Sequence, residues 1–470
     1  MQFGSLPMNR GVTAISSISD NKRIWGWWWF DWANQPYNTL LLTFIFAPYF
    51  ASAVAPDPVT GQAVWGWMNA IAGVLIALMA PILGSIADNT GNKRSWILFW
   101  SLLYILGSTA LWWAVPGASQ SEIIFILIVF AIGMVGLEYG IIFTNALLPT
   151  LGPREELGRI SGSGWAFGYV GGLVSLIVML LFLAENEKGV TLIGLAPMLG
   201  LDPEMREGTR FVGPFTALWY LVFVIPFFLW VREPSSEQRL TRDVVTRGLT
   251  QLRTTVRGLP QHPSLLAYLG SSMFYRDALN GIYAFGGIYA AGVLGWSIIQ
   301  IGVFGILAAS IGAIFCWIGG RADRRWGPKP VIVVCILALI AVCTVIVATD
   351  RSMVLFMPVD TGSNLPDIVF YICGGVIGAA GGTLQASSRT MMVRQANPER
   401  MTEAFGMFAL SGKVVSFLAP GLIALATTLT GSQRLGVAPL ILLFLAGLFL
   451  LRWVDAEGLE ASEFQTRPAK

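Results

Sequence analysis

The sequence predicts an all-α membrane protein in which twelve transmembrane helices form two pseudo-symmetric six-helix bundles. Composition is the first observation, because 55% of the residues are hydrophobic and only 12% are charged, about half the charged fraction of a soluble domain. Apolar stretches long enough to cross a bilayer recur along the whole chain. Polar patterns of the first half return at corresponding places in the second half, which indicates a duplicated unit.

Twelve segments combine few charges with the roughly 20 apolar residues that a bilayer-spanning helix needs. They lie at about 25–53, 63–87, 95–115, 122–148, 160–184, 213–231, 265–290, 297–319, 330–348, 367–392, 402–429 and 435–453. We therefore expect an N-terminal six-helix bundle over residues 1–231, a cytoplasmic linker loop over 232–264, and a C-terminal bundle with its tail over 265–470.

The distribution of Lys and Arg predicts the orientation in the membrane. With the N-terminus inside, roughly 22 of the 30 basic residues lie in cytoplasmic segments and about 5 lie outside, as the positive-inside rule requires. Both termini are therefore expected in the cytoplasm. Residues 1–23 contain no apolar core, so no cleavable signal peptide is expected. Short loops and size favour a bacterial inner membrane, and Trp27, Trp28 and Trp29 fit an interfacial aromatic belt.

The first and the seventh span each carry the spacing D-x-x-N-x-x-Y. The two copies are Asp31, Asn34, Tyr37 and Asp277, Asn280, Tyr283. Steps of three residues spread these side chains over roughly 120° of one helix face. Two such faces in lipid, supplied by a duplicated sequence, predict the two walls of one solute pathway.

The loops after the second and the eighth span match as well. The first loop reads G-x-x-x-D-x-x-G-x-K-R, with Gly84, Asp88, Gly91, Lys93 and Arg94. The second loop keeps Gly319, Asp323, Gly327 and Lys329, with one extra residue before its second glycine. Near the ends of spans 4 and 10, Asn145-Ala146 and Gln385-Ala386 form a further pair. Every match joins span n to span n+6, an order that chance does not explain.

The first of these loops resembles the signature of the major facilitator superfamily, and twelve spans with inner termini are similar to it along most of the chain. A narrower resemblance is to the "unknown major facilitator" branch, which includes the fungal autophagy-related vacuolar amino-acid effluxers. It rests on Asp31-Trp-Ala-Asn34 with Tyr37, Asn145–Pro149, Gly168–Gly172, Gly381–Arg389, and Phe405-Gly406 leading to Gly412-Lys413. Pro36 departs from this pattern, in which we expect a small residue.

The resemblance implies a solute carrier whose two bundles rock around a central site lined by spans 1, 4, 7 and 10. It also implies a gate in which Asp88 faces the N-terminal end of a helix in the opposite bundle, where the helix dipole favours an anion. Lys93 and Arg94 would anchor to lipid phosphates, and Asp323 would act as Asp88 does, less strongly. The alternative is a solvated turn whose bases only fix the topology.

Six charged side chains lie within or near the ends of the spans: Asp31, Glu138, Arg276, Asp277, Arg389 and Lys413. Each costs roughly 2.5–3.5 kcal/mol at mid-membrane, so we expect the three acids to neutralise the three bases or to face water. The expected partners are Glu138 or Asp31 for Arg276, and Asp31 or Asp277 for Lys413. Snorkelling to phosphates is an equally good explanation for Arg389.

The candidates for substrate binding or coupling fall mainly on the four cavity-lining spans. They are Asp31, Asn34, Tyr37, Asn38, Glu138, Asn145, Arg276, Asp277, Asn280, Tyr283, Gln385 and Lys413. A zwitterionic ligand would bind its carboxylate to Arg276 or Lys413 and its amine to Asp31, Glu138 or Asp277. The same three acids are candidates for coupling transport to protons. The alternative is that the set only forms inter-helix contacts that close the pathway.

The predicted function is secondary active transport of a small polar or zwitterionic, amino-acid-like solute by alternating access, with proton coupling as a further hypothesis. Alternatives are a sugar or muropeptide permease of the same superfamily and a non-transporting receptor or scaffold. The sequence has no Walker loop and no H-E-x-x-H pair, so neither ATP-driven pumping nor an enzyme is expected. No cofactor, metal site or nucleic-acid partner is predicted, and the four cysteines match no zinc or redox spacing.

Overall fold

The computed structural model describes residues 20–458 except residues 187, 234–240, 297 and 361. In this part of the chain the architecture is helical apart from one antiparallel hairpin, β1 (Met353–Val354) and β2 (Met357–Pro358). The helices of the first half are α1 (Asp20–Pro36), α2 (Phe46–Tyr49), α3 (Pro58–Thr90), α4 (Lys93–Ala110), α5 (Gln120–Asn145), α6 (Leu157–Val178), α7 (Glu207–Arg210), α8 (Val212–Phe223) and α9 (Ile225–Trp230).

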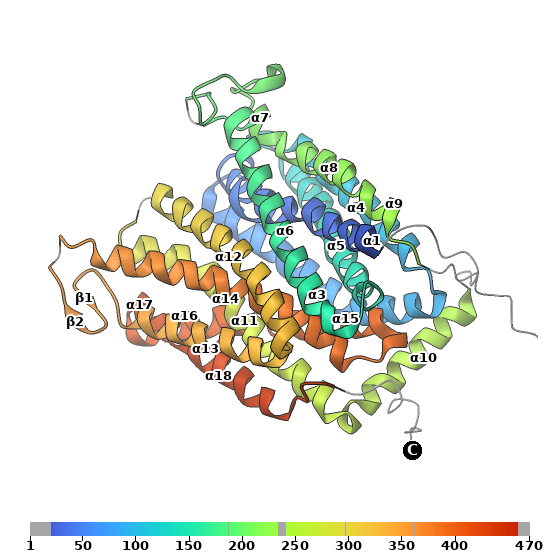
Figure 1. Ribbon diagram of the computed structural model, residues 1–470. Coiled ribbons are helices and arrows are strands. Elements are labelled where there is room, and N and C mark those ends of the chain that lie inside the picture. Colours follow the sequence, from blue (N-terminus) through green and yellow to red (C-terminus); the bar gives the residue numbers. More distant parts are fainter. Residues whose placement is uncertain (1–19, 187, 234–240, 297, 361, 459–470) are drawn as a thin grey trace, which may run out of the picture.

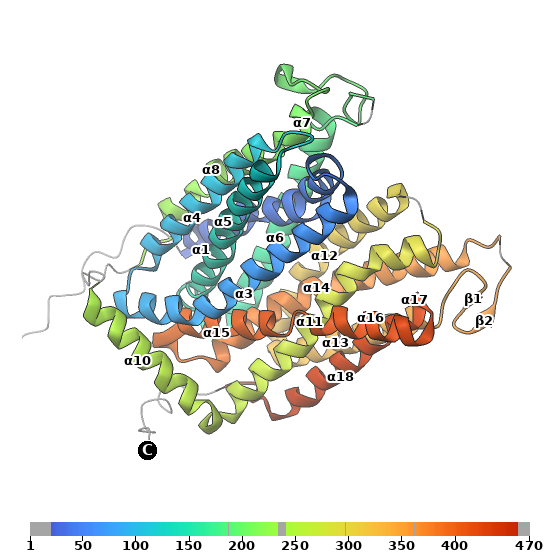
Figure 2. The ribbon, with the colours of Figure 1, turned by 180° about the vertical axis from the view of Figure 1, so that it is seen from behind.

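The second half begins after a helix in the linker, α10 (Arg242–Gly258). Its helices are α11 (Pro263–Gly292), α12 (Ile298–Trp326), α13 (Pro328–Val347), α14 (Leu365–Gln395), α15 (Met401–Val414), α16 (Leu418–Thr430), α17 (Gln433–Gly436) and α18 (Pro439–Leu450). Figures 1 and 2 show the two halves as two packed groups of long helices. The predicted all-α fold with paired six-helix bundles is confirmed.

Eleven helical stretches of the described residues are long and apolar enough to cross a membrane. The remaining predicted span, the seventh along the chain, is α11, a continuous helix of 30 residues. Its mean hydropathy is lower than that of the other spans, because polar side chains lie along it, such as Ser272, Arg276, Asp277 and Asn280. The polar character of α11 is an early indication that it lines the pathway.

Interruptions in two of the spans bear on the site. The first span leaves α-helical geometry at Tyr37 and continues as a π-helix over Tyr37–Phe44, then again over Phe50–Val54. Such π-helical stretches are rare and frequent at functional sites. The eleventh span breaks between α15 and α16, so that a new helix N-terminus begins at Leu418 inside the bundle.

The chain ends and α10 define one end of the molecule, which we call the terminal face. Here Arg23 donates to the Thr150 carbonyl oxygen at 2.9 Å, and Arg154 lies 3.9 Å from Glu457. The opposite end, which carries α7 and the β1–β2 hairpin, is called the hairpin face. At the hairpin face, α7 of the first half and β1–β2 of the second half lie far apart in both views. Near the terminal face, α3 of the first half and α15 of the second half lie side by side.

The two halves approach each other most closely at the terminal face, through α3 against α15 and α6 against α12. A Cβ atom on Gly84 would lie 2.5 Å from the Thr402 carbonyl oxygen, and one on Gly162 would lie 2.5 Å from the Cys316 carbonyl oxygen. Because real Cβ atoms do not approach backbone so closely, glycine is required for this contact. The terminal face is therefore closed by helix backbones that touch across the halves.

Two stripes of glycines at steps of four allow close helix packing. Gly164, Gly168 and Gly172 place α6 against α1, and Gly374, Gly378 and Gly382 place α14 mainly against α12. Small residues at steps of four let helix backbones approach within contact distance. The first stripe fixes the position of α1 and therefore of Asp31.

The linker contains an amphipathic helix, α10, that crosses the terminal face, and residues 234–240 of the linker lie outside the described residues. α10 packs on α3, where the Ser85 hydroxyl donates to the Gly248 carbonyl oxygen at 2.8 Å. Arg400, which precedes α15, donates to the Thr255 hydroxyl at 3.1 Å. The linker therefore contacts both halves at their closed end.

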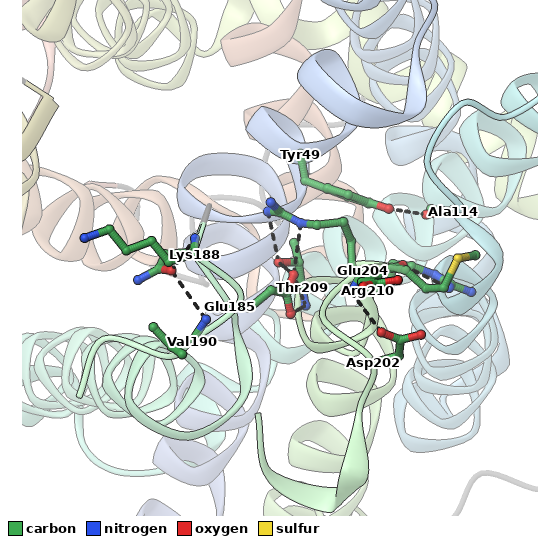
Figure 3. A network of polar contacts seen from close by, with 12 residues as sticks. Tyr49, Ala114, Glu185, Lys188, Val190, Asp202, Glu204, Thr209 and Arg210 are labelled. Atoms are coloured by element: carbon green, nitrogen blue, oxygen red, sulfur yellow. Dashed lines mark hydrogen bonds and ion pairs between the residues drawn. The ribbon is translucent and has the colours of Figure 1, made fainter. Parts of the chain in front are cut away.

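The loop between α6 and α7 is held by a buried carboxylate that the sequence analysis did not identify. Glu185 accepts hydrogen bonds from the Thr209 amide at 3.1 Å and the Thr209 hydroxyl at 2.6 Å, and it pairs with Arg206 at 2.9 Å. Nearby, Tyr49 of α2 donates to the Ala114 carbonyl oxygen (Figure 3). The Arg206 guanidinium lies over the Tyr49 ring, 5.9 Å from its centroid, and so links the hairpin-face loop to the end of the first span.

Candidate functional site

A central cavity of about 760 Å³ lies between the two halves. Its walls come from α1 and the following π-helix, α5 and α6 in the first half, and from α11, α12, α14 and α15 in the second half. Ten of the twelve predicted binding or coupling residues line it: Asp31, Asn34, Asn38, Glu138, Asn145, Arg276, Asn280, Tyr283, Gln385 and Lys413. Its volume falls within the roughly 300–1,000 Å³ typical of small-molecule sites.

Tyr37 and Asp277 do not reach the cavity, which corrects the expectation that each triad forms one wall. Tyr37 is fully buried and donates its hydroxyl to the Phe130 carbonyl oxygen of α5 at 2.7 Å. Asp277 is fully buried and accepts from the Ala419 amide at 2.7 Å. Ala419 lies in the first turn of α16, where an anion is favoured, so Asp277 stabilises the helix that begins at the break in span 11.

The most connected charge in the cavity is Arg389 of α14, which inserts into the first half. Its Nη1 lies 3.2 Å from Asp31 Oδ2 and 3.2 Å from Asn145 Oδ1, and its Nη2 donates to the Ser161 carbonyl oxygen at 2.8 Å. The guanidinium also lies over the ring of Trp27, 4.7 Å from its centroid. One side chain of the second half therefore joins α1, α5 and α6 of the first half.

This arrangement corrects three predictions. Arg389 does not snorkel to lipid, since its side chain is 5% exposed and paired with Asp31. Asp31 is consequently not the partner of Arg276 or Lys413. Trp27 is buried against Arg389, and its indole donates to the Thr144 carbonyl oxygen, so it is not part of an interfacial belt.

A second ion pair crosses the cavity between Glu138 of α5 and Lys413 of α15, with Nζ 2.8 Å from Oε1. The two side chains are 27% and 24% exposed, so both remain accessible from the cavity. Charge pairs that remain partly hydrated contribute little stability, roughly 0–1 kcal/mol. This pair can therefore exchange partners with a ligand at low cost.

Arg276 is the cavity cation that stands apart. Its Nη1 donates to the Phe408 carbonyl oxygen at 2.7 Å, and its guanidinium carbon lies 4.1 Å from the Phe408 ring centroid. Among the described residues no carboxylate lies within ion-pair distance of it, although Glu138 is close enough to attract it. Gly412 leaves room for the guanidinium, because a Cβ there would contact it. A planar cation with free donors thus faces the cavity.

The gate loop has the geometry that the resemblance implied for Asp88. Its carboxylate accepts from the backbone amides of Thr402 at 3.2 Å and Glu403 at 2.9 Å, in the first turn of α15 in the opposite half. Gly91 adopts a φ of +65°, a left-handed conformation that ends α3 and suits glycine. Lys93 lies 3.6 Å from Asp88, which brings a cation to the same carboxylate.

The two bases of this loop, which were expected to anchor to lipid phosphates, contact protein groups. Lys93 also lies 3.7 Å from Glu233, and the Arg94 amide donates to the same carboxylate at 3.2 Å. The Arg94 side chain donates to the Phe228 carbonyl oxygen. Burial raises the pKa of Glu233, and the charge of Lys93 opposes that shift. The bases therefore tie the gate loop to the end of α9.

The second copy of the loop has a different environment. Asp323 is 1% exposed and packs against Gly158 near the start of α6, which is the symmetric counterpart of the contact between Asp88 and α15. Neither of its carboxyl oxygens has a hydrogen-bond partner within the described residues. Asp323 thus lies against a helix start in the opposite half, as Asp88 does, but backbone amides do not hold its carboxyl.

Comparison with known proteins decides the family. The family profile described as "Vacuole effluxer Atg22 like" matches residues 53–460, most of the chain. The chain belongs to this Atg22-like family. It is 25% identical to the uncharacterized MFS-type transporter YxiO of Bacillus subtilis, over 92% of this chain and 94% of that protein. It is also 24% identical to autophagy-related protein 22 of Cryptococcus neoformans, over 66% of this chain and 53% of that protein.

Solved structures support the same fold for this Atg22-like chain. The proton:xylose symporter XylE bound to 6-bromo-6-deoxy-D-glucose aligns with a TM-score of 0.70 at 12% identity, covering 95% of this chain and 99% of that one. A bacterial homologue of the iron transporter ferroportin, in an outward-facing state, aligns with a TM-score of 0.65 at 15% identity, covering 92% and 98%. Together with the family match and the similarity to YxiO, this fold identifies an integral membrane transporter of the major facilitator superfamily.

Proposed function

We propose that this Atg22-like protein is a secondary transporter that moves a small polar, carboxylate-bearing solute of the amino-acid type by alternating access. The observation that carries the proposal is the charge arrangement in the cavity. Asp31 and Glu138 are paired across the halves with Arg389 and Lys413, whereas Arg276 is not in an ion pair among the described residues. The family description, a vacuole effluxer, is consistent with a carrier of this kind.

In this mechanism the substrate carboxylate binds the free donors of Arg276, whose planar fork suits two oxygens. The substrate amine binds Glu138, which is exposed to the cavity and releases Lys413 in exchange. Asn280 and Tyr283, which lie on α11 together with Arg276, supply neutral donors and acceptors. Because ligand and Lys413 compete for one carboxylate, binding loosens one of the two ion pairs that join the halves.

The described conformation is closed at the terminal face, and alternating access requires these contacts to separate. Asp88 would leave the start of α15, and Arg389 would leave its site between Asp31 and Asn145. If the positive-inside rule holds, the terminal face is cytoplasmic and this state opens outward. We assign both termini to the cytoplasm on the same basis, and the short loops and the size favour a bacterial inner membrane.

Proton coupling is assigned to Asp31. Its counter-ion, Arg389, belongs to the other half, so opening of the terminal face would leave the carboxylate without its cation. A buried carboxylate without a counter-ion takes up a proton. Asp277 is a poorer candidate, because its amide partner lies in the same half and would move with it.

The first test is a thermal-shift screen of the purified protein with amino acids, sugars and muropeptides, followed by uptake into proteoliposomes. A carried solute should raise the unfolding temperature, since ligands stabilise the state that binds them. We expect Arg276→Gln to abolish that shift and Arg276→Lys to restore part of it. Arg452→Gln, which removes an exposed cation outside the cavity, is the control and should behave as wild type. Stabilisation by sugars alone would reject the substrate class.

The coupling assignment is tested by measuring uptake against pH in Asp31→Asn and Glu138→Gln. Asp31→Asn should remove the pH dependence, because its side chain cannot take up a proton. Glu138→Gln should weaken substrate binding and leave the pH dependence in place. If Asp31→Asn retains the wild-type pH profile, Asp31 is not the coupling site.

A further inference from the structure

A second hollow lies on the outside of the second half, away from the central cavity. It is a groove of about 890 Å³ between α12 and α13, with α14 as its floor. Small residues such as Gly319, Gly375 and Ala379 form the hollow, and larger exposed side chains such as Trp326 and Val334 stand at its edges. The lining side chains are apolar except for the hydroxyls of Tyr371 and Thr383, the indole N–H of Trp326 and the thiol of Cys335, so the groove suits a hydrocarbon chain.

The groove has the length and direction of a lipid chain in a membrane. On α12 it is lined from Leu307 to Trp326, which corresponds to about 30 Å of helix and matches the thickness of the hydrocarbon core. Its walls are membrane-spanning helices, so it faces acyl chains rather than water. Trp326, 62% exposed, marks the end of the groove that lies at the terminal face.

Two arginines stand beside that end. Arg321 and Arg325 are exposed and lie one helical turn apart on α12. The Arg321 guanidinium lies 3.3 Å from the Trp317 ring centroid, and the Arg325 guanidinium lies 5.3 Å from that of Trp326. Stacking on indole rings orients the planar donors. Nη1 of Arg321 also donates to the Trp317 carbonyl oxygen at 3.0 Å, so an anion would use the other N–H groups of its five-donor guanidinium.

These cations have no acid of their own in the described part of the chain. Neither Arg321 nor Arg325 makes an ion pair there, and the nearby carboxylate of Glu156 is already shared by Arg159 at 2.6 Å and Arg324 at 2.7 Å. Like charges one turn apart on a helix repel each other. An anion placed between Arg321 and Arg325 would remove that repulsion.

We propose that the groove binds an anionic glycerophospholipid, with an acyl chain along α12 and its phosphate at Arg321 and Arg325. The apolar channel and the pair of cations at one end match the two parts of such a lipid. Basic pockets beside transmembrane helices bind acidic headgroups in this way. The site does not depend on the transported solute.

The test uses the full-length protein purified in a neutral detergent. Binding of dioleoylphosphatidylglycerol, dioleoylphosphatidylcholine and glycerol phosphate is followed by native mass spectrometry and by the unfolding temperature. Phosphatidylglycerol should bind tightest and raise the unfolding temperature most. The double variant Arg321→Gln/Arg325→Gln should weaken phosphatidylglycerol by about fivefold for each cation removed, and Arg452→Gln should leave binding unchanged.

A second variant tests the groove separately from the charges. Ala379→Leu fills part of the floor and keeps both arginines, so it should reduce phosphatidylglycerol binding while the protein still inserts. Equal binding of phosphatidylglycerol and phosphatidylcholine would overturn the proposal. So would stabilisation by glycerol phosphate as large as that by the whole lipid, or unchanged binding in both variants.

Discussion

The first and the second half carry the same D-x-x-N-x-x-Y spacing and present different members of it to the cavity. In the first half Asp31 and Asn34 line the cavity and Tyr37 is buried toward α5. In α11 the relation is reversed, since Asn280 and Tyr283 line the cavity and Asp277 is buried toward α16. A triad that spreads over roughly 120° of a helix turns one end away after a modest rotation.

The gate loops differ in the same manner. Asp88 and Asp323 occupy corresponding places, each against the start of a helix in the opposite half. Asp88 accepts two amides and lies near Lys93, whereas Asp323 has no hydrogen-bond partner in the described structure. Duplication therefore preserves where a side chain is placed along the membrane, and later divergence decides what it binds.

The charges that face the cavity are also divided between the halves. Both ion pairs across it take the acid from the first half and the base from the second: Asp31 with Arg389, and Glu138 with Lys413. The reverse arrangement, with an acid of the second half paired to a base of the first, does not occur in the cavity among the described residues. The charge pairs therefore do not follow the duplication of the fold.

The largest effect is expected for Arg389→Gln, which tests whether the halves depend on opposite charge. The variant removes the only cation within ion-pair distance of Asp31 in the described residues and breaks the contacts to Asn145 and Ser161. Loss of one partner of a buried pair costs on the order of 3 kcal/mol. This is enough to shift the equilibrium from the closed state of the terminal face strongly toward an open state. Cysteine accessibility at the terminal face should rise and uptake should fall.

Arg389→Lys provides the control for this variant. Lysine keeps the charge but lacks the fork that reaches Asp31, Asn145 and Ser161 together, so it should restore the closed state in part. Wild-type accessibility in Arg389→Gln would show that the backbone contacts at the glycines suffice for closure.

A smaller effect is expected for Asp88→Asn, compared directly with Asp323→Asn. An anion at a partly buried helix N-terminus contributes up to about 2 kcal/mol, and Asp88→Asn removes that charge from the start of α15. Asp88→Asn should insert normally, transport poorly and open more readily at the terminal face. Asp323→Asn should change uptake by no more than about twofold, because among the described residues its carboxyl accepts no hydrogen bond and forms no ion pair, and Arg394 acts on it only from beyond ion-pair distance. Equal losses in the two variants would refute the asymmetry of the gates.

Much of the fold and the general location of the site could be predicted from the sequence. Hydropathy gave the spans, the repeats gave their pairing, and the contact of Asp88 with a helix start in the opposite half followed from the resemblance. The polar residues of α11 were found because a charge in an apolar span is conspicuous. These features depend on position along the chain, which a sequence records directly.

The partners of the charges could not be predicted in the same way. Arg389 was assigned to no site, although it closes the motif Gly381–Arg389 that carried the resemblance. Its contacts with Ser161 and Trp165 depend on how α6 packs on α14. The π-helix that begins at Tyr37 also changes the rotation of the first span. Pro36 directly precedes it and removes a backbone donor, but a proline alone does not specify which irregular geometry follows. Rotation and tertiary contact decide these details.

The smallest effect is expected for the two tyrosines at the ends of the triads. Tyr37→Phe removes a buried hydrogen bond to Phe130 and should cost about 1 kcal/mol of stability, with the apparent affinity for substrate unchanged. Tyr283→Phe removes a hydroxyl that lines the cavity and should weaken substrate binding by roughly fivefold, with a smaller change in unfolding temperature. Measuring both quantities in both variants separates the roles. If Tyr37→Phe alters affinity and Tyr283→Phe alters only stability, the assignment of inward and outward triad members is reversed.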